Sequence, residues 1–212
     1  YMLAFARRQP WMDDEVKSGK WTKIPGRALS ECTLGVIGVG YIGKAVLRKA
    51  YSFGMKLLAT DIVEVPSDFL QQVPVEMVAL EELLAQSDFI SVNCDLNPTS
   101  RHLLDRSAFT KMKPSSVVIN TARGPIVDEY ALIEALKSGH IAGAAMDVFE
   151  VEPLPEDSPL RAMENVMLAP HNSNSSPEAW EKVHWNTIRN LLVGLGIPHD
   201  DFDAVMLAHK EG

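Results

Sequence analysis

The sequence has little cysteine and no long hydrophobic run. Cys32 and Cys94 are its two cysteines among 212 residues, and neither stands in a C-x-x-C or Cys/His spacing typical of zinc sites or disulfide frameworks. No apolar run approaches the roughly 20 residues that span a bilayer. Residues 1–8 carry their charges after the apolar positions, whereas a secretory signal begins with them. We therefore expect a cytoplasmic protein with no metal site and no membrane partner.

The sequence also lacks a basic run. Lysine and arginine total 20 against 28 aspartates and glutamates, a formal charge of −8. A protein that binds nucleic acid normally presents a basic face, so nucleic acid is not expected as a partner. The hydrophobic fraction of 46%, with 13 glycines and 13 prolines, is typical of a globular chain.

Short apolar runs rich in β-branched residues alternate with helical stretches. This alternation predicts an α/β fold, a doubly wound parallel sheet of the Rossmann type covered on both faces. The expected strands are residues 33–37, 56–61, 89–93, 116–120, 141–147 and 166–169, and the expected helices between them are 43–53, 81–86, 107–112 and 128–137. Amphipathic helices at 1–20 and 177–193 flank this alternation.

A glycine-rich turn follows the first expected strand directly and precedes a helix. Gly38, Gly40 and Gly43 form a G-x-G-x-x-G in residues 38–43. Glycines at these positions allow a tight turn, a close approach of the backbone to a pyrophosphate, and close packing of helix on strand. A glycine-rich turn of no binding function is the alternative, but the strand–turn–helix context favours a dinucleotide site.

Asp61 lies at the end of the second expected strand, 18 residues after Gly43. A carboxylate there accepts hydrogen bonds from the adenosine ribose and repels a 2′-phosphate. The following residues 62–64 contain no arginine or lysine to neutralise such a phosphate. The sequence therefore predicts NAD rather than NADP as the cofactor.

Three further motifs identify a family. Residues 120–128 read Asn-Thr-Ala-Arg-Gly-Pro-Ile-Val-Asp, residues 145–153 read Ala-Met-Asp-Val-Phe-Glu-Val-Glu-Pro, and residues 169–171 read Ala-Pro-His. In order and spacing they closely resemble the signatures of the D-isomer-specific 2-hydroxyacid dehydrogenases, including enzymes similar to phosphoglycerate dehydrogenase. The resemblance extends from the first helix to about Leu192 and implies an oxidoreductase that transfers a hydride between NAD(H) and a D-2-hydroxy acid or 2-oxo acid.

The resemblance implies three catalytic residues, and their chemistry suits the reaction. Arg123 offers a forked guanidinium for the substrate carboxylate, although a lone arginine would more often form a surface salt bridge. His171 is the expected acid/base, and Glu152 is its expected partner, which fixes the tautomer and keeps the proton available for reduction. The other histidines are expected to be structural: His102, His140, His184, His199 and His209.

The same resemblance implies the cofactor contacts outside the glycines. Tyr41 and Ile42 would contact the pyrophosphate, and Cys94 would line the adenosine side, a position that equally suits a buried inert thiol. Thr121, Ala122 and Arg123 would border the nicotinamide ribose, and Asp147 would bind the carboxamide. Met146 and Phe149 are expected in the core.

The sequence departs from the family pattern in two places. A polar run, Asn-Ser-Asn-Ser-Ser, follows His171 where the family usually has an apolar residue and glycine. The chain also begins within what resembles the interdomain helix. We expect residues 1–22 to form an interdomain or dimerisation helix, residues 23–176 the dinucleotide-binding domain, and residues 177–212 a C-terminal helix and tail that return toward a substrate domain. We therefore expect the chain by itself to bind NAD but to turn over substrate slowly. Because members of the family look like dimers, we also expect a homodimer.

The sequence also permits two non-catalytic functions. One is an NAD-responsive binding module similar to the corepressors that resemble this family. The other is a scaffold that oligomerises through the two amphipathic helices. Retention of Arg123, Glu152 and His171 favours the enzyme.

Overall fold

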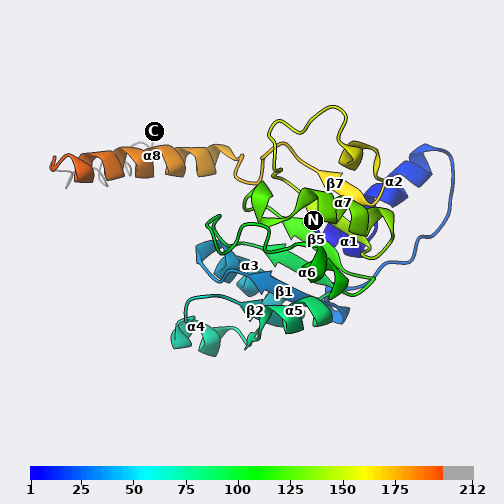
Figure 1. Cartoon of the computed structure of the whole chain (residues 1–212), viewed down its shortest axis with the longest axis horizontal. Coiled ribbons are helices and arrows are strands. Elements are labelled where there is room, and N and C mark those ends of the chain that lie inside the picture. The colour runs from blue at the N-terminus through cyan, green and yellow to red at the C-terminus, as the bar shows by residue number, and fades with distance from the viewer. Residues whose placement is uncertain (198–212) are drawn as a thin grey trace. The chain divides into compact units, whose positions relative to one another are not determined.

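A computed structural model describes residues 1–197, in which a seven-stranded parallel sheet forms the centre (Figure 1). The strand order is β3-β2-β1-β4-β5-β6-β7, and every pairing between neighbours is parallel. The strands are β1 (Thr33–Ile37), β2 (Lys56–Thr60), β3 (Glu76–Met77), β4 (Phe89–Val92), β5 (Val117–Asn120), β6 (Gly143–Met146) and β7 (Val166–Leu168). This confirms the α/β doubly wound fold predicted from the alternating pattern.

Helices cover both faces of the sheet and form two separate cores (Figure 1). The α-helices are α1 (Met2–Ala6), α2 (Gln9–Lys17), α3 (Tyr41–Ser52), α4 (Ser67–Gln72), α5 (Leu80–Gln86), α6 (Arg106–Thr110), α7 (Glu129–Lys137) and α8 (Pro177–Gly194), and short 3₁₀ turns lie at Leu29–Glu31, Gly124–Ile126 and Pro159–Ala162. Buried residues of α5, α6 and α7 form one core, and those of α1, α3 and α4 form the other. Successive strand residues alternate between the two cores, as in Leu57 and Leu58.

The predicted single helix over residues 1–20 is wrong: two helices, α1 and α2, occupy this segment. Arg8 between them has a φ of 55°, in the left-handed region, and therefore interrupts the helical path. Pro10 stands at the start of α2, where its missing N–H costs nothing, but it could not continue a helix from residue 1. Phe5 on α1 is buried, whereas no residue of α2 is.

Sequence periodicity missed α4 and β3. In α4 only Phe69 is buried, so the helix has no apolar stripe. β3 is a two-residue edge strand with both side chains exposed, too short for an alternating pattern. The ends of the other predicted elements lie within two residues of the observed ends. Met146 and Phe149 are buried, as predicted.

The chain divides after His171 into two compact units. The second unit begins at Asn172 and contains α8, whose first turn is capped by Ser176 Oγ accepting from Ala179 N at 3.1 Å. Residues 198–212, including His199, His209 and the predicted tail, lie outside the described residues. The roles assigned to residues 1–22, 23–176 and 177–212 stay predictions. Among residues 1–197, no helix is long and apolar enough to cross a membrane.

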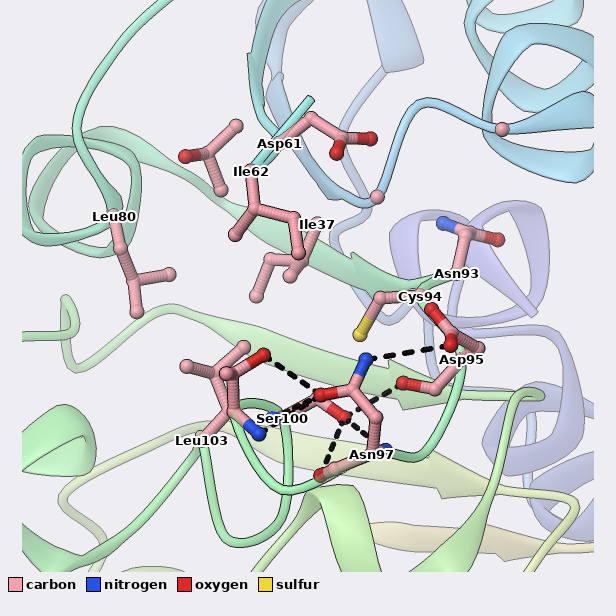
Figure 2. Close-up of a pocket in the computed structure, with 14 residues that line it drawn as sticks. Ile37, Asp61, Ile62, Leu80, Asn93, Cys94, Asp95, Asn97, Ser100 and Leu103 are labelled. Atoms are coloured by element: carbon pink, nitrogen blue, oxygen red, sulfur yellow. Dashed lines mark hydrogen bonds between the residues drawn. The ribbon is translucent and has the colours of Figure 1, made fainter. Parts of the chain in front are cut away.

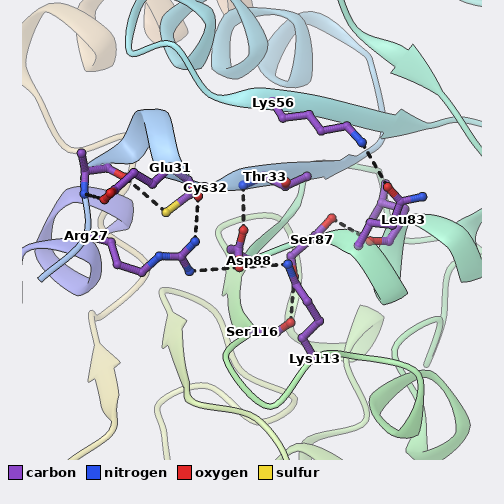
Figure 3. Close-up of polar contacts among 12 residues, drawn as sticks. Arg27, Glu31, Cys32, Thr33, Lys56, Leu83, Ser87, Asp88, Lys113 and Ser116 are labelled. Carbon is purple, nitrogen blue, oxygen red and sulfur yellow. Dashed lines mark hydrogen bonds and ion pairs between the residues drawn. The ribbon is translucent and has the colours of Figure 1, made fainter.

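A buried carboxylate ties together the amino ends of the central strands (Figure 3). Asp88, at 6% exposure, accepts from Arg27 Nη1 and Lys113 Nζ through Oδ1, at 3.0 and 2.9 Å, and from Thr33 N through Oδ2 at 2.8 Å. Burial alone would raise the pKa of Asp88, but these three donors outweigh it and hold the pKa below its ordinary value of 3.8. The ion cluster therefore links the segment before β1 to the starts of β1 and β4.

We predict that Asp88→Asn lowers the free energy of unfolding by about 2–4 kcal/mol at neutral pH, because it leaves two cations without their shared anion. Because the folded pKa is lowered, the contribution of Asp88 is complete above the unfolded pKa of 3.8 and is lost as the pH falls through the folded pKa. Urea unfolding of wild type and variant at decreasing pH measures it.

The difference in unfolding free energy between the wild type and Asp88→Asn should therefore become smaller at acidic pH. Asp14→Asn, on the exposed side of α2, is the matched control and should change the unfolding free energy by less than about 0.5 kcal/mol. An Asp88→Asn variant as stable as the control would contradict this role for the cluster.

Candidate functional site

In the glycine turn after β1, backbone segments lie close to one another. Gly38 has a φ of +91°, and a Cβ there would lie 2.6 Å from Cys94 N. A Cβ on Gly43 would lie 2.0 Å from Gly38 O, so both positions require glycine. A Cβ on Gly40 would meet none of the surrounding protein atoms within 4 Å. The space above Gly40 is therefore open to a ligand that approaches the start of α3.

Asp61 follows β2 and closes the same turn. Its Oδ2 accepts from Val39 N at 2.6 Å, and its Oδ1 accepts from Val63 N at 2.9 Å. These bonds fix the carboxylate beside the glycine turn, and Asp61 is one of the residues that line a cavity of about 370 Å³. Figure 2 shows Asp61 and Ile62 across this cavity from Asn97 and Ser100, with the Cys94 thiol on a third side.

A second cavity, of about 540 Å³, adjoins the first. It is lined by Ile42, Val92, Leu96, Thr121, Ala122 and Arg123, and it shares Asn93, Cys94 and Asp95 with the first. These shared residues follow β4, so the two cavities form a continuous surface along the carboxyl ends of β2, β1, β4 and β5. Tyr41 and Ile42 are 98% and 64% exposed at the start of α3.

The turn that carries Arg123 is held by Asn120, the last residue of β5. Asn120 Nδ2 donates to Arg123 O at 2.9 Å, and Asn120 Oδ1 accepts from Ala122 N at 3.0 Å. Arg123 Nη1 donates to Ala122 O at 2.6 Å, and the side chain is exposed. The guanidinium therefore stands at the mouth of the second cavity on a fixed backbone.

His171 and Glu152 form a hydrogen-bonded pair. His171 Nδ1 lies 2.8 Å from Glu152 Oε2, and Glu152 Oε1 accepts from Phe149 N at 3.0 Å. Burial alone would raise the pKa of Glu152, but the bonds from His171 and Phe149, with the nearby Arg123 charge, hold it below its ordinary value of 4.5. The carboxylate is thus ionised at neutral pH and orients the imidazole through Nδ1.

The backbone beside this pair is also fixed. His171 N donates to Asp147 O at 2.7 Å, and His171 has a φ of 53°, which a non-glycine residue rarely adopts. Asp147 itself is 1% exposed just beyond β6. The pair lines a third cavity of about 530 Å³ together with Pro153, Leu168 and Pro170.

The predicted site residues thus gather at one edge of the sheet, in two groups. The two joined cavities are lined by Gly38, Gly40, Ile42, Asp61, Cys94, Thr121, Ala122 and Arg123, and the third is lined by Glu152 and His171. Three predicted site residues line none of these cavities: Tyr41, Gly43 and Asp147. Sequence reasoning missed Asn93, Asp95 and Asn97 as lining residues, although polar residues directly after a buried strand could have indicated them. Within residues 1–197, no group of three histidine, cysteine or acidic side chains is placed to hold a metal.

Comparison with curated proteins gives close relatives. The chain is 41% identical over 197 residues to a glyoxylate reductase of Korarchaeum cryptofilum, which covers 90% of this chain and 59% of the relative. It is 40% identical over 201 residues to a hydroxypyruvate reductase of Thermotoga maritima, which covers 92% of this chain and 64% of the relative. The chain spans about three fifths of the length of these two relatives.

Solved structures agree with this relationship. A D-lactate dehydrogenase from Aquifex aeolicus, complexed with NAD and lactic acid, has a TM-score of 0.83 at 30% identity over 92% of this chain and 63% of its own. A D-isomer specific 2-hydroxyacid dehydrogenase from Xanthobacter autotrophicus Py2, in complex with NADPH and MES, has a TM-score of 0.78 at 34% identity over 93% and 81%.

The sequence also matches a described family over most of its length. Residues 1–173 match the family described as D-isomer specific 2-hydroxyacid dehydrogenase, NAD binding domain. The resemblance inferred from residues 120–128, 145–153 and 169–171 is confirmed, as is NAD as the cofactor of the domain. The chain therefore belongs to the family of NAD-binding domains of the D-isomer specific 2-hydroxyacid dehydrogenases.

Proposed function

We propose that this chain forms the cofactor-binding part of a dehydrogenase that interconverts D-2-hydroxy acids and 2-oxo acids. The observation that carries the proposal is the His171–Glu152 pair, joined at 2.8 Å at the same sheet edge as Arg123 and the glycine turn. A module that only bound NAD would have no use for an imidazole held by an ionised carboxylate. We therefore favour the enzyme over the binding module and the scaffold.

Arg123 is proposed to bind the substrate carboxylate. A guanidinium has five N–H donors, so the bond from Nη1 to Ala122 O leaves enough donors for a bidentate carboxylate contact. The positive charge also polarises a carbonyl next to that carboxylate. Asn120 supports this role because it holds the backbone on both sides of the turn.

His171 is proposed as the acid/base and Glu152 as its partner. The bound cofactor supplies or accepts the hydride at C2 of the substrate. With Nδ1 held by Glu152, Nε2 of His171 is the nitrogen left to give a proton to the C2 oxygen in reduction and to take it back in oxidation. The ionised Glu152 stabilises the protonated imidazole that this step requires.

The residues along the two joined cavities are proposed to hold the dinucleotide. Gly38, Gly40 and Gly43, with the backbone of Tyr41 and Ile42 at the start of α3, would face the pyrophosphate. Asp61 would accept from the adenosine ribose, and Cys94 would lie on the adenosine side. The nicotinamide side of the cofactor is proposed to contact Thr121, Ala122, Arg123 and Asp147.

The proposed substrate is a small 2-oxo or 2-hydroxy acid. The similar proteins include reductases of glyoxylate and hydroxypyruvate and a D-3-phosphoglycerate dehydrogenase, so the shared chemical unit is the 2-oxo carboxylate. We also propose a homodimer, which the exposed apolar side chains of Leu3, Val16 and Trp21 would suit.

We predict that the chain binds NADH at least about 10-fold more tightly than NADPH, because Asp61 repels a 2′-phosphate. Asp61→Ser should reduce this preference, chiefly by improving NADPH binding. Isothermal titration calorimetry with both cofactors measures it. Glu64→Gln, an exposed acidic residue three positions on, is the control and should keep the preference. Equal affinities in the wild type would overturn the proposal for Asp61.

In the protein at its natural length, we predict that His171→Ala reduces kcat for 2-oxo acid reduction by roughly 10²- to 10⁴-fold. Glu152→Gln should reduce it roughly 100-fold. Because the pKa of Glu152 is lowered, its carboxylate stays charged above pH 4.5 and favours the protonated imidazole. The decline of the reduction rate with rising pH should therefore move to lower pH in Glu152→Gln.

NADH oxidation against a panel of small 2-oxo acids measures both effects. Glu156→Gln, an exposed residue of the same acidic loop, is the matched control and should retain the wild-type profile. A Glu152→Gln variant with wild-type turnover and an unshifted pH profile would refute the partner role. Undiminished reduction by His171→Ala would refute the acid/base assignment.

A further inference from the structure

A second group of titratable side chains lies behind the proposed catalytic residues. His102, Glu129 and Glu150 come from three separate segments and meet next to the turn that carries Arg123. None of the three lines the cavities that contain Gly38, Arg123 or His171. The group is therefore separate from the side chains that line these three cavities.

The backbone joins the His102 segment to the Arg123 turn. His102 N donates to Pro125 O at 2.8 Å, Leu104 N donates to Ile126 O at 3.1 Å, and Leu104 O accepts from Asp128 N at 3.1 Å. This short ladder includes a parallel bridge between Leu104 and Val127. The residues just after Arg123 are thus fixed along one side.

The other side of the turn packs against the loop that carries Glu152. A Cβ at Gly124 would lie 1.8 Å from Phe149 O and 2.6 Å from Glu150 N, so the two backbones are in direct contact. Phe149 N in turn donates to Glu152 Oε1 at 3.0 Å. A movement of Phe149 and Glu150 would therefore reach both Gly124 and Glu152.

The side chains lock these segments to one another. Glu150 Oε1 accepts from Glu129 N at 3.1 Å, and Glu129 Oε2 accepts from Glu150 N at 3.2 Å, a reciprocal pair between the start of α7 and the Glu152 loop. His102 Nε2 is buried and lies 2.9 Å from Glu150 Oε1, without the alignment of a hydrogen bond. Burial and the neighbouring Glu150 carboxylate raise the pKa of Glu129, as expected where two carboxylates lie close together.

We propose that His102, Glu129 and Glu150 form a clamp of positioning residues that holds the Arg123 turn and the Glu152 loop in fixed relation. The clamp rests on the proposed function of Arg123 and Glu152, because it acts through them. A single half-exposed ion pair would contribute little. Here, however, the reciprocal backbone bonds and the Gly124 contact leave the two loops little freedom to move separately, and small displacements of catalytic groups reduce rates strongly.

Nuclear magnetic resonance of ¹⁵N-labelled chain tests the clamp without an activity assay. The reporter is the Nδ1–H of His171, whose exchange with water we expect to be slowed while it donates to Glu152. Glu150→Ala should raise its exchange rate about 10-fold or more, because the loop that fixes Glu152 is released. Glu150→Gln keeps an Oε1 acceptor for Glu129 N and should restore most of the protection.

Controls separate this effect from general destabilisation. Glu81→Ala, on α5, removes a carboxylate that pairs with Lys111 and should leave the His171 signal unchanged. If Glu150→Ala does not fold, His102→Ala, which retains the reciprocal Glu129–Glu150 bonds, should still raise the exchange rate. Wild-type protection of His171 in the folded clamp variants would overturn the proposal.

A kinetic measurement on the protein at its natural length distinguishes the clamp from the function on which it rests. Glu150→Ala should lower kcat for 2-oxo acid reduction about 10-fold and leave KM for NADH unchanged, because the clamp lies away from the dinucleotide cavities. A parallel rise in KM for NADH with unchanged kcat would contradict it. If the wild type reduces no 2-oxo acid, the proposed function fails, and the His171 exchange rate still decides whether the clamp exists.

Discussion

The common direction of the seven strands is the constraint on which the site depends. Because every pairing is parallel, all carboxyl ends lie at one edge of the sheet, and the residues just beyond those ends must gather there. Gly38 follows β1, Asp61 follows β2 and Cys94 lies just beyond β4. The turn with Arg123 follows β5, Asp147 follows β6, and His171 comes three residues after β7. Residues more than 130 positions apart in the chain thus share one edge.

Two different physical factors shape the proposed site at that edge: close backbone contact at the glycine turn, and charge at the His171–Glu152 pair. Gly38 and Gly43 are sites where any side chain would collide with backbone, and the space above Gly40 stays open. Such contact shapes the proposed dinucleotide surface without using side chains. At the other end, hydrogen bonds to Glu152 outweigh its burial and keep it ionised beside His171. The proposed clamp of His102, Glu129 and Glu150 combines both kinds of contact. It holds one loop that touches Gly124 through its backbone and also carries the Glu152 carboxylate.

The sequence predicted the sheet because strand runs are encoded over a few residues. Its local motifs also indicated Gly38, Asp61, Arg123 and Glu152 as candidate site residues. It did not predict the break at Arg8, where a left-handed residue and Pro10 interrupt an otherwise continuous amphipathic pattern. It also missed β3, an edge strand with both side chains exposed. The clamp could not be predicted, since His102 meets Glu150 only through tertiary contacts between separate loops. A histidine without a motif carries no signal of its partner.

Arg123 and His171 are proposed to act on one substrate beside the bound dinucleotide. The most direct measurement is a crystal structure of the protein at its natural length with NADH and oxamate, an unreactive analogue of a 2-oxo acid. We expect the oxamate carboxylate to contact the Arg123 guanidinium. Its carbonyl oxygen should lie within hydrogen-bond distance of His171 Nε2, while His171 Nδ1 remains bonded to Glu152. Oxamate bound away from both side chains, or a His171 turned away from the nicotinamide, would contradict it.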